Sequence, residues 1–171
     1  MPMKTADLCD RLSADAHVCL APMRSFGGRR AVAGRIATVR TFEDAARVRQ
    51  QIALPGEGRI LVVDAGGSLR AAVLGDNMAR LGLHNGWAGV LLYGAVRDVD
   101  ELAALDFAVF ASGSVPARGA NEGTGEVDTQ VTFGGAVFRP GDFIAIDGDG
   151  VAVTATAQGG IAKIAAFTLL G

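Results

Sequence analysis

Two short segments of the chain carry residues that could bind and polarise a small anionic substrate. The first is 74–78, Leu-Gly-Asp-Asn-Met, where an apolar run passes through Gly75 into a stretch with helical periodicity. Free N–H groups at a helix N-terminus, with the helix dipole behind them, bind carboxylates and phosphates. Glycine also lets a ligand approach the main chain closely. The alternative is that Asp76 or Asn77 only caps the helix.

The second segment is 93–98, Tyr-Gly-Ala-Val-Arg-Asp, which follows a predicted buried strand at 88–93. In α/β sheets, ligands usually bind at the loops beyond the carboxyl ends of strands. In such a loop, Arg97 and Asp98 can supply a cation and a metal-binding carboxylate side by side. The alternative is that these two side chains form an ordinary surface ion pair.

The spacing between the two segments favours a single site. Twenty residues separate Asp76 from Arg97, which is about one helix plus one strand. The helix N-terminus and the loop after the next strand should then lie at the same edge of the sheet. Asp100 and Glu101 follow closely and could hydrogen-bond to water on a metal ion.

The rest of the chain supplies the elements that would position these segments. The pattern predicts a short helix that begins at Thr5 and further helices over 43–54, 77–84 and 98–105. It predicts strands at 31–41, 59–64, 69–74, 88–93 and 107–112. A loop is expected at 94–98, and hairpins are expected at 131–138 and around 147–150. The middle of the chain is therefore βαβ-like and the last third is mostly β. This order predicts an α/β protein with a mixed, layered architecture.

The composition predicts one globular domain spanning 1–171. Half of the residues are apolar, 24 are glycine, and no repeat or linker interrupts the chain. A net charge of -2 gives no electrostatic reason to bind nucleic acid or an anionic membrane. The longest apolar runs, such as 88–96, are too short to cross a bilayer.

The cysteines and histidines indicate the compartment and the kind of metal. Cys9 and Cys19 lack CxxC spacing and no signal peptide precedes them, so we expect reduced thiols in a cytoplasmic protein. With only two histidines in the sequence, His17 and His84, we do not expect a zinc site of the usual His/Cys type. Any metal should be a hard cation held by oxygen.

A set of linked motifs resembles the RraA-like family. They are Gly-Asp-Asn-Met at 75–78, Asn-Gly-Trp at 85–87, Gly-Ala-Val-Arg-Asp at 94–98, Phe-Gly-Gly at 133–135, and Pro-Gly-Asp at 140–142 followed by Asp-Gly-Asp-Gly at 147–150. The resemblance extends from Asp7 to Val153. It implies a three-layer β/β/α fold, similar to a swivelling domain, and a homotrimer with sites between subunits.

The resemblance also implies roles for individual residues. The family includes the regulator of ribonuclease activity A and 4-hydroxy-4-methyl-2-oxoglutarate aldolases. The aldolase type carries an Asp, twenty residues, then Arg-Asp, with an acidic residue three positions later, and this pattern falls on Asp76, Arg97, Asp98 and Glu101. The regulator type typically lacks the Asp after the Arg. By this resemblance Asp98 would hold Mg²⁺ or Mn²⁺, Arg97 would stabilise an enolate, and Asp76 or Glu101 would orient water for proton transfer.

The implied substrate is a small 2-oxo acid. Its carboxylate would bind the backbone at Gly75, Asp76, Asn77 and Met78. The implied activity is a divalent-metal-dependent (class II) aldolase that releases pyruvate, with oxaloacetate decarboxylation through the shared pyruvate enolate. The alternative is a non-enzymatic regulator that binds and inhibits an RNA-degrading endonuclease, through protein and not RNA contacts. The polar stretch 119–125 could cover the site or line a subunit interface.

Overall fold

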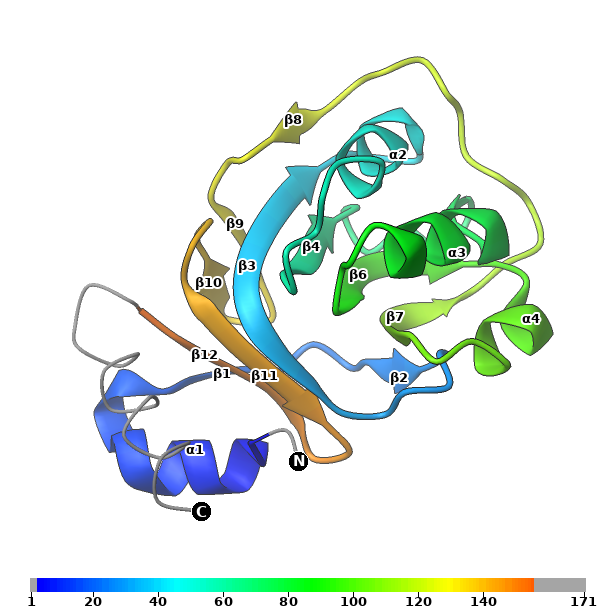
Figure 1. Ribbon diagram of the computed structural model, residues 1–171. Helices are drawn as coiled ribbons and strands as arrows, with labels where there is room; N and C mark the ends of the chain where they lie inside the picture. The colour runs from blue at the N-terminus through cyan, green and yellow to red at the C-terminus, as the bar shows by residue number, and fades with distance from the viewer. Residues whose placement is uncertain (1–2, 156–171) are drawn as a thin grey trace.

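The computed structural model describes residues 3–155 of the chain, and a mixed β-sheet forms the centre of this part (Figure 1). The strand order is β1-β12-β11-β3-β4-β6-β7-β2, with β5 beside β6 and β8 beside β3, and β9 and β10 form a separate hairpin. The strands are β1 (His17–Cys19), β2 (Arg24–Ser25), β3 (Val32–Arg40), β4 (Ile60–Asp64), β5 (Ala72–Leu74), β6 (Gly89–Val96), β7 (Ala108–Ser114), β8 (Glu126–Val127), β9 (Val131–Phe133), β10 (Ala136–Phe138), β11 (Phe143–Asp147) and β12 (Gly150–Thr154).

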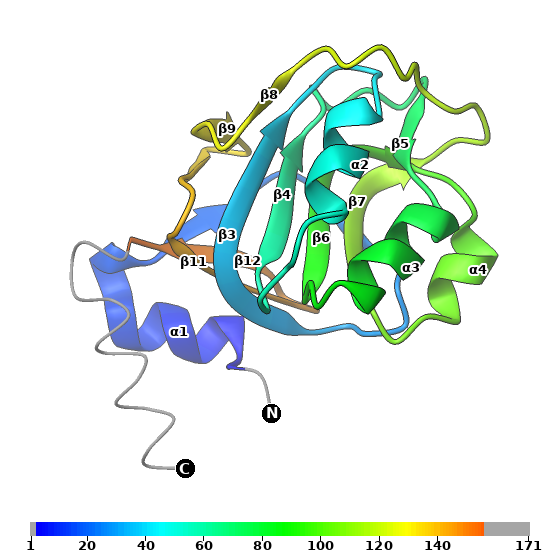
Figure 2. The same ribbon diagram turned by 45° about the horizontal axis from the view of Figure 1, so that its top comes forward.

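Four α-helices accompany the sheet in the described range: α1 (Thr5–Leu12), which a short 3-10 helix (Ser13–Asp15) follows, α2 (Ala46–Ile52), α3 (Asp76–His84) and α4 (Val99–Ala103). Three of them, α2, α3 and α4, cover one face of the parallel strands (Figure 2). The hairpin β9–β10 packs on the opposite face, and α1 packs against β11 and β12 through Leu8 and Leu12. These layers confirm the predicted α/β fold of β/β/α type with a mixed sheet.

The parallel strands β3, β4, β6 and β7 form the centre of the sheet. Successive side chains of a strand point to opposite faces. Leu61 and Val63 accordingly join the core under the helices, whereas Ile60 and Val62 join the core under the hairpin. Because both faces are covered, residues 60–63 of β4 form an uninterrupted apolar run, as in other buried parallel strands.

Strand β3 connects the parallel strands to the antiparallel ones. Its first residues, 32–35, pair with β11, and its later residues, 36–40, pair in parallel with β4. Figure 1 shows β3 curving through both groups. The C-terminal hairpins around 133–136 and 147–150 form as their turn residues predict.

Several predicted element boundaries are wrong, among them those of β6, β5 and α2. Strand β6 continues to Val96, so the expected loop at 94–98 begins only at Arg97. Strand β5 covers 72–74 rather than 69–74, because it pairs only with the last residues of β6. Helix α2 begins at Ala46 rather than at residue 43, since Glu43 has a left-handed backbone (φ 53°) that an α-helix does not accept.

Two further expectations concern the thiols and the membrane. Cys9 and Cys19 are both free thiols, and burial raises the pKa of Cys19. Within residues 3–155, no helix is long and apolar enough to span a membrane. The expectation of one domain over 1–171 includes residues outside the described range and stays a prediction beyond it.

Candidate functional site

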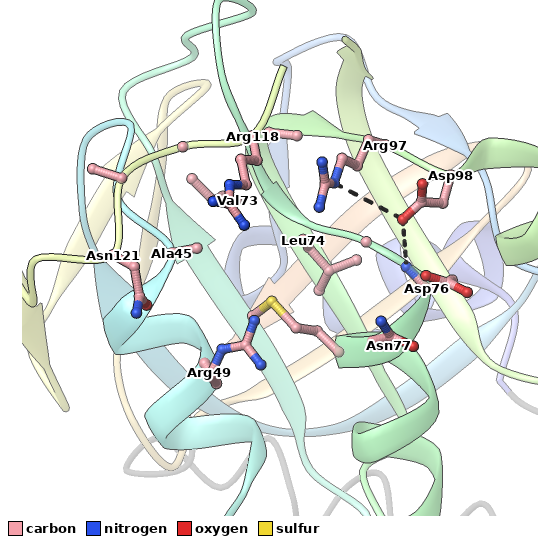
Figure 3. Close-up of a pocket in the computed structure, with 15 residues that line it drawn as sticks. Ala45, Arg49, Val73, Leu74, Asp76, Asn77, Arg97, Asp98, Arg118 and Asn121 are labelled. Carbon is pink, nitrogen blue, oxygen red and sulfur yellow. Dashed lines mark hydrogen bonds and ion pairs between the residues drawn. The ribbon is translucent and has the colours of Figure 1, made fainter. Parts of the chain in front are cut away.

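A cleft of about 340 Å³ opens at the carboxyl edge of the parallel strands. Both chemistry-bearing segments reach it, as the spacing of Asp76 and Arg97 predicts. Figure 3 shows their side chains entering from separate elements. The lining residues are Ala45 and Arg49 of the α2 region, Ala72 to Met78 of β5 and α3, Arg97 and Asp98 after β6, and Arg118 to Asn121 of the segment after β7.

The pairing of β5 with β6 brings the two segments into contact. Leu74 lies opposite Val96 in a parallel register, and the Arg97 N–H donates to the Leu74 carbonyl at 3.0 Å. Beyond this pair, the segments that follow β5 and β6 run side by side. The Asp76 N–H then donates to Asp98 Oδ2 at 3.2 Å. This register is the structural reason that a helix N-terminus and the Arg-Asp pair form one site.

Gly75 provides the space for this contact. A Cβ placed on Gly75 would lie 2.6 Å from Asp98 Oδ2 and 3.4 Å from Cγ of Arg97. The backbone of Gly75 is extended (φ -135°, ψ -169°), a conformation that other residues adopt readily. A larger residue would therefore have to displace the nearby carboxylate, although the backbone angles would accept it.

Asp98 presents an oxygen atom to the cleft. Its backbone is left-handed (φ 60°), which Asp tolerates better than most residues, and α4 starts at the next residue. Oδ2 accepts the Asp76 N–H and lies 3.9 Å from Nε of Arg97, whereas Oδ1 has no hydrogen-bond partner within residues 3–155. The side chains of Arg97 and Asp98 are 39% and 36% exposed, so the contribution of this ion pair to folding stability is small.

Helix α3 presents its N-terminus to the cleft, but not every N–H group is free. The Asp76 N–H donates to Asp98 Oδ2, and the expectation that this group binds substrate stays a prediction. Helix geometry leaves the N–H groups of Asn77 and Met78 for a ligand. The Asp76 carboxylate lines the cleft and contacts Arg80 at 3.6 Å, one turn along the helix.

Glu101 is not brought into this cleft. It lies exposed on α4 and does not line the cavity, and the same holds for Asp100. Both residues lie in α4, which begins at Val99, directly after Asp98. The catalytic role expected for Glu101 therefore rests on the family resemblance alone.

Two arginines of the cleft, Arg49 and Arg118, escaped sequence analysis, whereas Asn121 lies in a stretch that was expected to cover the site or line an interface. Arg118 and Asn121 belong to an irregular segment that partly coincides with the stretch 119–125. The part of that stretch from 119 to 121 lines the cleft. Together with Arg97, three guanidinium groups line the cavity against the carboxylates of Asp76 and Asp98. The excess of positive charge suits an anionic ligand.

The donors present fit only a metal ion that keeps most of its water. Within residues 3–155, no three His, Cys, Asp or Glu side chains lie close enough together to hold an ion. Mg²⁺ is commonly held by one or two carboxylates, with water and substrate oxygens filling the other positions. The free Oδ1 of Asp98 is a hard oxygen donor of this kind.

Fold and site together define an RraA-like protein. The family model described as "RraA-like: Aldolase/RraA" matches residues 5–153, and the chain belongs to this family. It is 47% identical over 154 residues to a protein of Aromatoleum aromaticum provisionally named 4-hydroxy-4-methyl-2-oxoglutarate aldolase. That match covers 90% of this chain and 97% of the relative.

Two solved structures are similar over nearly the whole chain. One is described as S-adenosylmethionine:2-dimethylmenaquinone methyltransferase from Geobacillus kaustophilus (TM-score 0.88, 42% identity, covering 90% of this chain and 95% of that one). The other is the RNA-processing inhibitor RraA from Thermus thermophilus (TM-score 0.87, 43% identity, covering 90% and 93%). Because proteins of such similar structure carry different functional names, the activity has to be argued from the site.

Proposed function

We propose that the protein is a carbon–carbon lyase that cleaves 4-hydroxy-4-methyl-2-oxoglutarate, or a related 4-hydroxy-2-oxo acid, and releases pyruvate. The observation that carries the proposal is the contact between the Asp76 N–H and Asp98 Oδ2. It joins an open helix N-terminus, a guanidinium group and a free carboxylate oxygen in one cleft. The relatives named as aldolases of this substrate support the same activity.

The chain's own groups match the pyruvoyl half of such a substrate. The N–H groups of Asn77 and Met78 would bind its carboxylate. Arg97 would donate to the 2-keto oxygen, where negative charge develops as the enolate forms. Donors fixed in this way stabilise the transition state more than the ground state, which is the requirement for catalysis.

The reaction balances without a redox partner. A base takes the proton of the 4-hydroxyl group, the C3–C4 bond breaks, and its electron pair forms the enolate of pyruvate. The C4 fragment leaves as a carbonyl compound, and C3 of the enolate is then protonated. Oxaloacetate decarboxylation gives the same enolate with carbon dioxide as the leaving fragment, so one site would perform both reactions.

Asp98 would hold Mg²⁺ or Mn²⁺ through Oδ1. When bound, the ion would act as a Lewis acid that withdraws charge from the 2-keto group. For the base, Asp76 is the better placed carboxylate within one chain, because it lines the cleft and Glu101 does not. Asp76 would act by orienting a water molecule, since its carboxylate contacts Arg80.

Pyruvate release tests the proposal. We expect the purified protein with Mg²⁺ to release pyruvate from 4-hydroxy-4-methyl-2-oxoglutarate and from oxaloacetate, and EDTA to suppress both reactions. Release no faster than in buffer alone, for both substrates, would contradict the proposal. Equal release with EDTA and with Mg²⁺ would contradict its metal dependence.

A second candidate function is regulation of an RNA-degrading endonuclease. It is favoured by the 43% identity to the protein described as an RNA-processing inhibitor. The partner would be a protein, bound through its arginine-rich segments. A pull-down with the C-terminal region of such an endonuclease tests this function. Retention of the partner by an Asp98→Asn variant that has lost pyruvate release would show two separable activities.

The assembly and location are also part of the proposal. A homotrimer in the cytoplasm is what the family membership favours. Light scattering on the purified protein, as it elutes from a size-exclusion column, gives the molar mass of the assembly directly. A mass of one or two chains would contradict the trimer.

A further inference from the structure

We propose that Arg118 and Arg49 form a subsite for the second carboxylate of a dicarboxylic substrate. The inference rests on the proposed function, which places the pyruvoyl group against Arg97 and α3. Figure 3 shows the guanidinium groups of Arg97, Arg118 and Arg49 directed into the cleft, with Asp98 at one end of the view and Asn121 at the other. A substrate held at Arg97 would therefore extend toward Arg118.

Neither Arg118 nor Arg49 has an ionic partner among the residues that the structure describes. Within residues 3–155, other arginines are paired, among them Arg29 with Asp106 and Arg40 with Glu126. No ion pair is formed by Arg118 or Arg49 in the same range. A guanidinium group binds a carboxylate through two parallel hydrogen bonds, so two unpaired groups in one cleft are suited to an anionic ligand.

The segment that carries Arg118 is fixed rather than loose. The Gly119 N–H donates to the Ala72 carbonyl at 2.8 Å, and the Ala72 N–H donates to the Ala117 carbonyl at 2.8 Å. A Cβ on Gly119 would lie 2.7 Å from the Glu43 carbonyl oxygen, so the segment packs directly on the chain before α2. Arg118 therefore extends from a backbone held on both sides.

A buried carboxylate joins this segment to α2. Asp44 is only 2% exposed, and its Oδ2 accepts the N–H groups of Glu122, Gly123 and Thr124, each at 3.1 Å. Its Oδ1 accepts the Ala46 N–H at 2.9 Å and so caps the start of α2. One side chain thus sets the positions of the two elements that carry the unpaired arginines. Such a prearranged site loses little conformational freedom on binding.

The charge of the cleft favours a dianion over a monoanion. The carboxylate and the 2-keto oxygen of the pyruvoyl group would be satisfied at α3 and Arg97, which leaves Arg118 and Arg49 without a counter-charge. A second carboxylate on the substrate would neutralise them. Asn121, at the same end of the cleft, offers an amide donor for the remaining carboxylate oxygen.

Comparing the binding of two 2-oxo acids tests this subsite without requiring any catalysis. Titration calorimetry with Mg²⁺ present would compare 2-oxoglutarate with 2-oxopentanoate, which has the same carbon chain without the second carboxylate. We expect the protein to prefer the diacid. Arg118→Met or Arg49→Met should each weaken diacid binding about 10- to 100-fold, the range for losing charge-assisted hydrogen bonds, and leave monoacid binding within about twofold.

Arg29→Met is the matched control. It removes one positive charge from an arginine that pairs with Asp106 outside the cleft, and both acids should bind as before. Arg118→Lys should recover part of the diacid binding. Circular dichroism would confirm that each variant is folded.

Three results would overturn the subsite: no preference for the diacid, no loss in either cleft variant, or equal losses for both acids. Failure to bind either acid counts against it as well. The lyase proposal can be contradicted independently of the subsite. Diacid preference that depends on Arg118, in a protein that releases no pyruvate, would support the subsite and contradict the lyase.

Discussion

Gly75 and Asp98 are packed so closely that a single methyl group would not fit between them. A Cβ on Gly75 would lie 2.6 Å from Asp98 Oδ2. The contact places the left-handed Asp98 and the start of α3 in one fixed arrangement.

Replacing Gly75 by alanine tests whether this packing matters. Since the backbone angles of Gly75 suit alanine, the fold should survive, and the Asp98 carboxylate should be displaced instead. A displacement on the order of 1 Å can lower turnover about 100-fold. We therefore expect Gly75→Ala to lose about 100-fold in pyruvate release with little change in melting temperature.

Gly148→Ala is the control for that variant. Gly148 lies in the turn of the β11–β12 hairpin, and a Cβ there would meet no atom within 4 Å. Its activity should equal that of the unmodified protein. A fully active Gly75→Ala variant would show that Asp98 needs no fixed position.

Asp44 should contribute stability that disappears in acid. Burial raises its pKa, but hydrogen bonds from Ala46, Thr124 and Glu122 outweigh burial and leave the pKa lowered. A folded-state pKa below the unfolded value of about 3.9 stabilises the native state at neutral pH, and this contribution is lost as pH falls through the folded-state pKa. At pH 7, Asp44→Asn should lower the free energy of unfolding by about 1.5–3 kcal/mol.

Urea unfolding between pH 7 and pH 3 measures this effect. The difference in the free energy of unfolding between the unmodified protein and Asp44→Asn should narrow below about pH 4. There the Asp44 carboxylate of the unmodified protein becomes protonated and its contribution to stability is lost. Asp149→Asn, at an exposed hairpin position, should unfold like the unmodified protein. A gap that stays constant down to pH 3 would mean that the Asp44 charge is not what stabilises the fold.

Much of the fold and half of the cleft could be predicted from sequence because the signals are local. The apolar run 60–63 and the turn at 147–150 specify their own conformations. The twenty residues between Asp76 and Arg97 correctly predicted that both reach one edge. The register of Leu74 with Val96 was not predictable, since the strand through Val96 was expected to end at residue 93.

The other half of the cleft comes from distant segments. Asp44 falls inside the helix predicted over 43–54, and its backbone partners at 122–124 lie 78 to 80 residues away. Arg118 lies in a segment without periodicity, so no pattern relates it to Arg49 or Arg97. For Glu101 the family pattern and the position in the structure differ, and its catalytic role stays a prediction. The spacing of Glu101 matches the family pattern, but the residue lies on α4 outside the cleft.

Deuterium exchange into the methyl group of pyruvate tests the central claim most directly, because it requires only the enolate that Arg97 is proposed to stabilise. Proton NMR in D₂O with Mg²⁺ follows the loss of the methyl signal. The account predicts exchange well above the rate in buffer, a drop on the order of 10²–10³-fold in Arg97→Met, and suppression in Asp98→Asn. Exchange at the buffer rate in the unmodified protein, or undiminished exchange in both variants, would contradict it.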